Sequence, residues 1–381
     1  MKHLRKFDSV SEMNTALASA TIDILALAYD NGTPVLKAKQ GPNYSEPFYV
    51  ENITQQDETL VIYMSPDYGS EYIVEYSINN INWVNLGRFE DREMAMELHP
   101  NDKIYLRTNS PYIGQADFRV RGISKIGGNI MSLMYGSNFT GNERTFPQRE
   151  YPGKALYGVF SSNTHLIDAS LLILPVTTLE KGCYQYMFGN CTALTVAPAL
   201  PATTLAQECY EAMFSGCTSL TTAPVLPATT LADNCYQSMF QNCTSLTTAP
   251  ALPATTVALQ CYSTMFYGCT SLTTAPSILP ATTLAENCYG GMFRGCTELT
   301  TAPELPATTL AEYCYDLMFY DCTHLNYIKC LATDISASEC TLSWLGNVAA
   351  SGTFVKNPNM SSWTTGTYGI PSGWTVQDAT A

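Results

Sequence analysis

The residues with the clearest capacity for chemistry are fourteen cysteines, all of which fall between Cys183 and Cys340. Thiolates can bind metal ions, and thiols can pair as disulfides. Twelve of the cysteines form pairs that are eight residues apart. Zinc sites use shorter Cys-x2–4-Cys spacings, which bring the thiolates together. This spacing therefore argues against a metal site, and we expect no metal ion and no cofactor.

The cysteine pairs belong to an internal repeat. Its unit reads Cys-Tyr-x-x-Met-Phe-x-x-Cys-Thr-x-Leu-Thr-x-Ala-Pro-x-Leu-Pro-Ala-Thr-Thr-Leu-Ala, and residues 209–232 are a clean copy. A period of this size is typical of a solenoid, in which each repeat forms one coil. The first cysteines of the pairs are 26 or 27 residues apart and are Cys183, Cys209, Cys235, Cys261, Cys288 and Cys314.

Degenerate copies flank these six repeats. Residues 155–166 fit the frame without cysteines, and residues 339–348 continue it with Trp344 and Leu345 in the Met-Phe positions. We therefore expect about eight coils. The outermost coils of a solenoid have one face that no neighbour covers, so atypical end copies are typical of caps.

Stacked coils would bring equivalent cysteines to about 5 Å from each other, which is within the Cα distance of a disulfide. Side chains in register point the same way, however, and this geometry disfavours bridging. We favour free thiols that act as small buried core residues over disulfides.

The apolar spacing within Cys-Tyr-x-x-Met-Phe-x-x-Cys predicts a helical or 3₁₀ turn with one face inward. Leu-Thr-x-Ala-Pro predicts a short extended piece, and Leu-Pro-Ala-Thr-Thr-Leu predicts a second extended or turn piece. Stacking of the coils would bury Leu, Met, Phe and Cys continuously.

The Met-Phe-x-x-Cys-Thr-x-Leu-Thr segment, with Leu-Pro and a period near 26, resembles the BspA-like (Treponema-type) leucine-rich repeats. The wording Cys-Tyr-x-x-Met-Phe is similar to the version in Bacteroides surface proteins and in virion proteins of the crAss-like phages that infect Bacteroides. This resemblance covers about residues 155–356. It implies a right-handed leucine-rich-repeat solenoid, and it implies a role in adhesion.

Two further modules are predicted before the solenoid. Residues 1–44 contain a capping-box signal at Ser9, which predicts a helix, and a hairpin of residues 22–29 and 33–39 around Asp30-Asn31-Gly32. Such a module is too small to be stable alone, so we expect it to attach the chain to a larger assembly or to a second copy.

Residues 45–140 predict a β-sandwich-like domain, with strands over 59–64, 71–77, 102–107 and 118–121. Gly127-Gly128 through Gly141 reads as the joint to the solenoid at 141–356. Residues 357–381 read as a C-terminal cap in which Trp363 and Trp374 cover the last coil. The expected fold class is therefore mixed β and α/β.

The sequence contains no recognisable catalytic motif. Its four histidines are scattered, and the carboxylates of the repeats occupy variable positions expected at the surface, where no pair is placed across a cleft. We expect no enzyme.

Positions that differ between near-identical repeats are the candidate binding surface. Two columns, three and six residues after each first cysteine, vary from repeat to repeat and are expected to face solvent on one side of the solenoid. Random drift at unconstrained positions explains this variation at least as well. The candidate ligand-binding residues are Tyr186, Gln241, Tyr267, Arg294 and Tyr320.

The charge balance narrows the function. With 33 acidic and 19 basic side chains the net charge is −14, which disfavours nucleic acid and anionic membranes as partners. The basic start of the chain is followed by polar residues where a signal peptide has an apolar segment, so we expect no export of the usual kind and no membrane insertion.

The leading hypothesis is a non-enzymatic virion structural protein, a head or tail appendage of a Bacteroides-type phage. Its N-terminal module would contact other virion proteins and self-associate, and its solenoid would bind a host glycan or protein. A bacterial cell-surface leucine-rich-repeat adhesin is the alternative.

Overall fold

The computed structural model describes residues 3–6, 24–30, 33–39, 43–56, 58–63, 73–88, 93–108, 122, 124–148, 153–361 and 363–380. The chain divides into two compact units, Met1–Glu46 and Pro47–Ala381. The regular secondary structure of the described residues is mostly strand, and α2 (Ser132–Tyr135) is their single short α-helix. The β part of the expected fold class is confirmed, whereas the helical part is limited to α2 within these residues.

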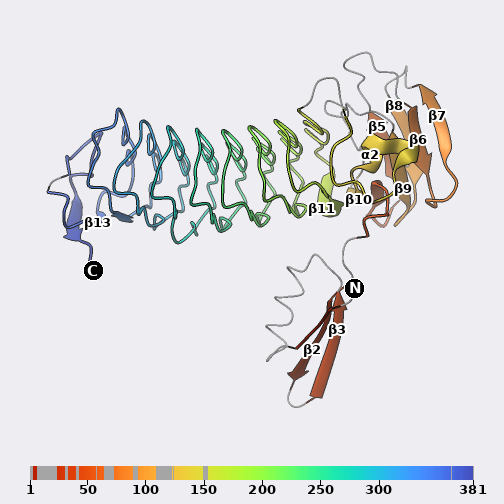
Figure 1. The fold of residues 1–381 in the computed structure, drawn as a ribbon, viewed down its shortest axis with the longest axis horizontal. Helices are drawn as coiled ribbons and strands as arrows, with labels where there is room; N and C mark the ends of the chain where they lie inside the picture. Colours follow the sequence, from red (N-terminus) through yellow and green to blue (C-terminus); the bar gives the residue numbers. More distant parts are fainter. Residues whose placement is uncertain are drawn as a thin grey trace. The chain divides into compact units, whose positions relative to one another are not determined.

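The first unit contains a three-stranded sheet in the order β1-β2-β3 (Figure 1). Its strands are β1 (His3–Lys6), β2 (Ile24–Asp30) and β3 (Thr33–Lys39). β2 and β3 are antiparallel with Asp30 opposite Thr33, so the predicted hairpin is confirmed. β1 is parallel to β2, a pairing that the sequence did not indicate. The helix predicted from Ser9 lies outside the described residues.

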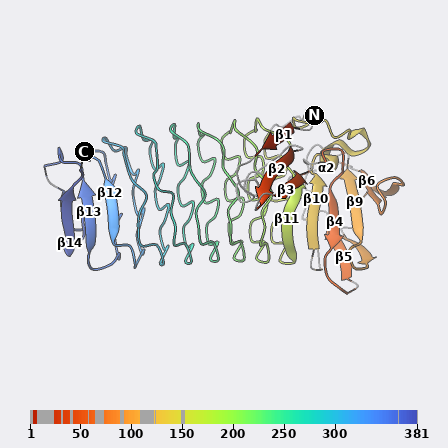
Figure 2. The same ribbon diagram turned by 90° about the horizontal axis from the view of Figure 1, so that it is seen from below.

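The second unit begins with a six-stranded sheet in the order β11-β10-β4-β9-β6-β7 and a separate antiparallel pair, β5-β8 (Figures 1 and 2). Strands were predicted at three of these places. The predicted strand at 118–121 lies outside the described residues, and the sandwich-like arrangement stays a prediction. The bounds are β4 (Tyr49–Asn52), β5 (Glu58–Tyr63), β6 (Ile73–Ser77), β7 (Val84–Arg88), β8 (Glu93–Leu98), β9 (Lys103–Thr108), β10 (Ser124–Asn129) and β11 (Leu166–Ile173).

Gly127 and Gly128, predicted to begin the joint to the solenoid, lie in a strand. Both lie in β10, which pairs with β4 on one side and with β11, the first strand of the repeat region, on the other. A Cβ atom on Gly127 would come within 2.4 Å of the Tyr49 ring, so glycine is required here because this aromatic ring lies directly over the backbone. The six-stranded sheet therefore continues from β4 through β10 to β11, the first strand of the repeat region. α2 and the 3₁₀ turn η1 (Gly136–Asn138) follow β10.

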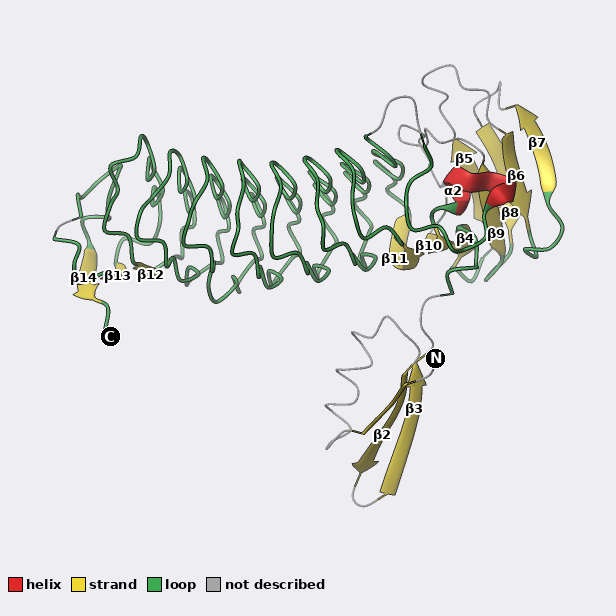
Figure 3. Cartoon of the chain, viewed as in Figure 1, coloured by secondary structure: helices red, strands yellow, loops and turns green. Residues whose placement is uncertain are grey.

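Each repeat contains a run of turns where the sequence predicted a helical or 3₁₀ turn (Figure 3). The turns are confirmed, whereas no continuous helix forms in the described repeats. We call this run the turn strip: it extends from the residue before the first cysteine of a repeat to its second cysteine, as in 208–217. Every fourth residue of the strip has a left-handed φ, for example 62° at Glu208, 50° at Ala212 and 75° at Gly216. A residue with positive φ interrupts a right-handed helix, so the strip cannot continue as one.

The hydrogen bonds of the turn strip alternate between local and inter-repeat partners. The N–H of Met213 donates to the carbonyl of Tyr210, three residues back, at 3.2 Å. The N–H of Tyr210 donates instead to the carbonyl of Cys235 in the next repeat, at 3.0 Å. Consecutive repeats are therefore joined by backbone hydrogen bonds along the whole strip.

The two extended pieces of the repeat are confirmed as parallel bridges between neighbouring repeats. Val196, Thr222, Thr248 and Thr274 pair successively in the Leu-Thr-x-Ala-Pro segment, and Thr230 pairs with Thr256 in the second segment. Near the C-terminus the bridges lengthen into a parallel sheet of β12 (Tyr327–Cys330), β13 (Gly352–Lys356) and β14 (Trp374–Asp378).

Rows of identical side chains fill the interior of the repeat region. Tyr210 stacks on Tyr236 with 5.9 Å between ring centroids, and Phe214 stacks on Phe240 at 5.6 Å. All fourteen cysteines are buried thiols outside any disulfide, as expected from the repeat. The second thiol of each repeat donates to the carbonyl of a phenylalanine in the preceding repeat, as Cys243 does to Phe214 at 3.2 Å. Cysteine thus supplies both a small apolar side chain and a weak donor.

Aromatic rings also close the two ends of the repeat region. Phe48, which precedes β4, stacks on Phe160 of the degenerate first copy at 5.5 Å, and Phe160 stacks on Phe188 at 5.4 Å. At the other end Trp363 stacks on Trp344 at 5.5 Å. The indole N–H of Trp374 donates to the carbonyl of Ala349 at 2.8 Å. The two tryptophans predicted to cover the last coil are therefore buried against it.

Candidate functional site

The variable side chains of the turn strips contact one another across repeats. The amide of Gln185 donates to the carboxylate of Glu211 at 2.7 Å, and the hydroxyls of Ser238 and Thr264 lie 2.8 Å apart. The five candidate ligand-binding residues are half-buried, whereas the sequence predicted that they face solvent. They are therefore held in place by their neighbours.

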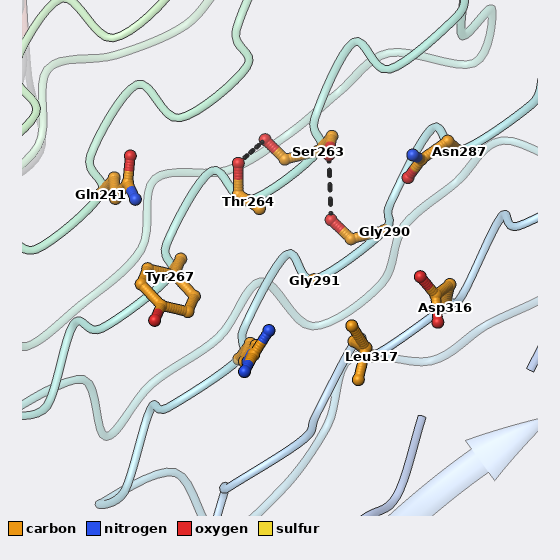
Figure 4. A pocket seen from close by; sticks show the side chains of 10 residues that line it. Gln241, Ser263, Thr264, Tyr267, Asn287, Gly290, Gly291, Asp316 and Leu317 are labelled. Atoms are coloured by element: carbon orange, nitrogen blue, oxygen red, sulfur yellow. Dashed lines mark hydrogen bonds between the residues drawn. The ribbon is translucent and has the colours of Figure 1, made fainter. Parts of the chain in front are cut away.

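A pocket of about 370 Å³ lies on this surface, across four consecutive repeats (Figure 4). The wall is formed by four positions of the repeat: the residue before the first cysteine, and the second, third and sixth residues after it. Its lining residues are Gln241, Ser263, Thr264, Tyr267, Asn287, Gly290, Gly291, Arg294, Asp316 and Leu317.

The pocket exists because one repeat carries two glycines where its neighbours carry side chains. Gly290 and Gly291 occupy the positions that hold Ser263-Thr264 in the preceding repeat and Asp316-Leu317 in the following one. A Cβ atom on Gly290 would lie 1.8 Å from Oδ1 of Asn287. Gly291 has a φ of +59° and its added Cβ would lie 3.1 Å from the methyl carbon of Thr264. Side chains at these two positions would fill the hollow.

Arg294 provides the positive charge of the pocket. Its guanidinium lies 5.5 Å from the ring centroid of Tyr267 and 5.1 Å from that of Tyr320. Both distances are within the range of cation–π attraction. Because the two tyrosines come from the preceding and following repeats, the guanidinium is held between them and has little conformational freedom to lose on binding.

Asp316 provides the negative charge. Its buried Oδ1 atom has no hydrogen-bond partner among the residues that the structure describes. Burial raises the pKa of this carboxyl, and the charge of Glu339 raises it further, whereas Arg294 lowers it. The wall of the pocket therefore contains a carboxyl group, Asp316, and a cation, Arg294.

The structure brings together four of the five predicted residues. Gln241, Tyr267 and Arg294 line the pocket, and Tyr320 lies outside the lining but contacts Arg294. Tyr186 is in an earlier repeat, where its hydroxyl accepts a hydrogen bond from the amide of Asn190, and it takes no part in the pocket. That four of these residues bind a ligand stays a prediction.

Sequence reasoning missed Ser263, Asn287, Gly290 and Asp316. The signal was present in a third variable column, two residues after each first cysteine. That column reads Gln185, Glu211, Gln237, Ser263, Gly290 and Asp316. A change from long polar side chains to glycine in one repeat marks a hollow in an otherwise continuous surface.

The thiols nearest the pocket are held in their protonated form. Burial raises the pKa of the nearest thiol rows, for example that of Cys269 to about 12, so these thiols stay protonated and are poor nucleophiles. Within the described ranges no three His, Cys, Asp or Glu side chains are grouped so that they could hold a metal ion. None of the helices in those ranges has the length and apolar character needed to span a bilayer.

Comparison of the chain with protein-family models, with curated proteins and with solved structures finds no significant match in any of the three. The function is therefore argued from the residues of this chain.

Proposed function

We propose that this protein is a non-enzymatic structural component of a phage virion, a head or tail appendage whose leucine-rich-repeat solenoid binds a host glycan or protein. The proposal extends the resemblance of the repeats to BspA-like sequences. The inter-repeat hydrogen bonds and the ring stacks between residues 26 to 29 apart support the solenoid assignment.

The observation that carries the binding role is the pocket. The interior of the six central repeats is built from the same Cys, Tyr, Met and Phe residues. The outer columns differ, and at one place they leave a hollow of about 370 Å³ with an arginine and a carboxylate in its wall. An invariant support with a varied and partly hollowed surface is the arrangement that a binding protein needs.

The attachment role is assigned to the first unit, Met1–Glu46. Its strands pair only with one another among the residues described, and three strands make a small core. Such a module gains stability when it packs on a larger surface or on other copies, as a particle would provide.

Quantitative peptide mass spectrometry tests the proposal on density-purified phage particles and on membrane fractions of the host. We expect recovery with the particles in a fixed copy number. A variant that lacks residues 1–44 should no longer be incorporated, and it should be recovered as a soluble protein that keeps the repeats. Recovery only in the host membrane fraction would contradict the virion assignment and support the bacterial adhesin instead.

A further inference from the structure

We propose that the pocket formed around Gly290 and Gly291 binds a neutral saccharide, as one sugar ring or the end of a short glycan. This inference names the ligand class of the surface to which the proposed function assigns binding, and it rests on that function. It is carried by the shape of the hollow and by the pair of opposite charges in its wall.

The opposite charges indicate a ligand that both donates and accepts hydrogen bonds without net charge. Asp316 lines the pocket, and its carboxylate can accept from a ligand hydroxyl. The guanidinium of Arg294 donates to hydroxyl oxygens from a fixed position between two rings. Sugar hydroxyls satisfy both requirements at once, since each is a donor and an acceptor.

Anionic ligands are disfavoured by the carboxyl group in the wall of the pocket and by a second one near it. Asp316 lines the pocket, and burial together with the charge of Glu339 raises the pKa of its carboxyl, so Glu339 lies near this wall. The chain as a whole carries a net charge of −14. A uronic or sialic acid would gain one contact with Arg294 but would meet this negative potential.

Cationic ligands are disfavoured by Arg294 itself, which lies in the wall of the pocket. A ligand ammonium group placed near Asp316 would be within reach of this guanidinium, which already interacts with the Asp316 charge. The pocket volume of about 370 Å³ is near the lower end of small-molecule sites, as one or two sugar rings require. The Tyr267 side chain adds an aromatic surface for the C–H groups of a sugar.

Saturation-transfer NMR on the full chain tests the ligand class with six methyl glycosides. The neutral probes are the glucoside, the galactoside, the mannoside and the N-acetylglucosaminide. Methyl glucuronide is the anionic probe and methyl glucosaminide is the cationic probe. We expect at least one neutral glycoside to bind, and we expect both charged probes to bind at least tenfold more weakly than that glycoside. No binding of any neutral glycoside, or tighter binding of a charged probe, would overturn the proposal.

Gly291→Leu locates the site. Leucine is accepted in this column at a left-handed φ, since Leu317 has a φ of 52°. The substitution places a side chain in the hollow and should abolish binding. Ala212→Leu is the matched control: it adds the same side chain to the same column, at a φ of 50°, outside the pocket. It should bind as the unmodified chain does.

Asp316→Asn tests the acceptor, because the amide keeps the shape but removes the charge and one acceptor oxygen. We expect affinity for the neutral glycoside to fall about tenfold. Equal affinity in this variant, or retained binding in Gly291→Leu, would show that the sugar binds elsewhere and would overturn the assignment. Neither result changes whether the chain is recovered with particles, so failure here is distinct from failure of the proposed function.

Discussion

The inner and the outer side chains of the turn strips differ in sequence while they share one backbone. Inside, the six central repeats carry the same Cys, Tyr, Met and Phe, each nearly or fully buried. Outside, the third position after the first cysteine is occupied by Tyr186, Ala212, Ser238, Thr264, Gly291 and Leu317, yet every φ there lies between 50° and 59°. The comparison teaches that the interior and the inter-repeat hydrogen bonds set the conformation, so the outer residues are free to differ.

Among the tests of this difference between inner and outer side chains, a change of pH has the largest expected effect on stability. Burial raises the pKa of the Cys191, Cys209, Cys261, Cys269, Cys322 and Cys330 thiols to about 12. The unfolded chain releases these protons from about pH 8.5, whereas the folded chain keeps them, so stability falls with rising pH by about 1.4 kcal/mol per thiol and pH unit up to about pH 12.

We therefore expect cooperative alkaline unfolding, well before pH 12, in circular dichroism scans under reducing conditions. At pH 8 the native thiols should not react with a thiol reagent, and all fourteen should react in denaturant. A free energy of unfolding that is constant from pH 8 to pH 11 would contradict the buried thiol rows.

Phe240→Ala tests the contribution of one interior side chain to stability. The side chain is fully buried and stacks on Phe214 and Phe266, in both cases with 5.6 Å between centroids. Truncation leaves a cavity and removes both stacks, so we expect a loss of about 3–5 kcal/mol in the free energy of unfolding. Urea denaturation monitored by circular dichroism measures it. A loss below about 1 kcal/mol would show that the ring row is not a main source of stability.

Gly268→Ala tests the left-handed positions. The residue has a φ of +72° and an added Cβ would lie 2.3 Å from Oδ1 of Asn242. We expect a loss of at least about 1–2 kcal/mol, from the φ penalty and the clash together. The double variant Gly268→Ala/Asn242→Gly removes the clash but keeps the φ penalty, so it should recover part of the loss. No recovery in urea denaturation would assign the whole effect to φ.

Gln241→Ala has the smallest expected effect on stability. Gln241 directly follows Phe240, so the two variants compare an outer side chain with an inner one at adjacent positions. The side chain is half-buried and no internal structure depends on it, so stability should change by less than about 0.5 kcal/mol in the same urea experiment. A larger loss would mean that the outer columns also stabilise the repeats, and that their variation is constrained.

The sequence alone was sufficient to predict the interior rows of the repeats. A fixed period places Phe214 beside Phe240 and Cys217 near Cys243 whatever the local conformation, so the interior rows and the buried thiols followed directly. The end tryptophans could be predicted because an uncovered coil requires an apolar cover.

The left-handed residues of the turn strip were not predicted because its apolar positions recur every four residues, which is close to the period of a helix. Residues such as Glu208 and Leu317 give no warning of a left-handed φ. The seventh position after the first cysteine does indicate a left-handed φ, because it holds only Asn, Gly or Asp, the residue types that tolerate this conformation. The residues there are Asn190, Gly216, Asn242, Gly268, Gly295 and Asp321. The pocket could not be foreseen in full because its wall combines columns from four repeats, and their spacing around the strip depends on those turns.

The hydrogen bonds that join each turn strip to the next also determine how the repeat region responds to tension. These hydrogen bonds connect consecutive repeats. A force applied to the two ends therefore acts on every boundary between repeats in series, and the weakest boundary opens first. Each released coil of 26 residues adds roughly 90 Å of extended chain, at about 3.5 Å per residue. A stretched molecule would therefore lengthen in equal increments, and the coils still folded would keep their outer surface in place.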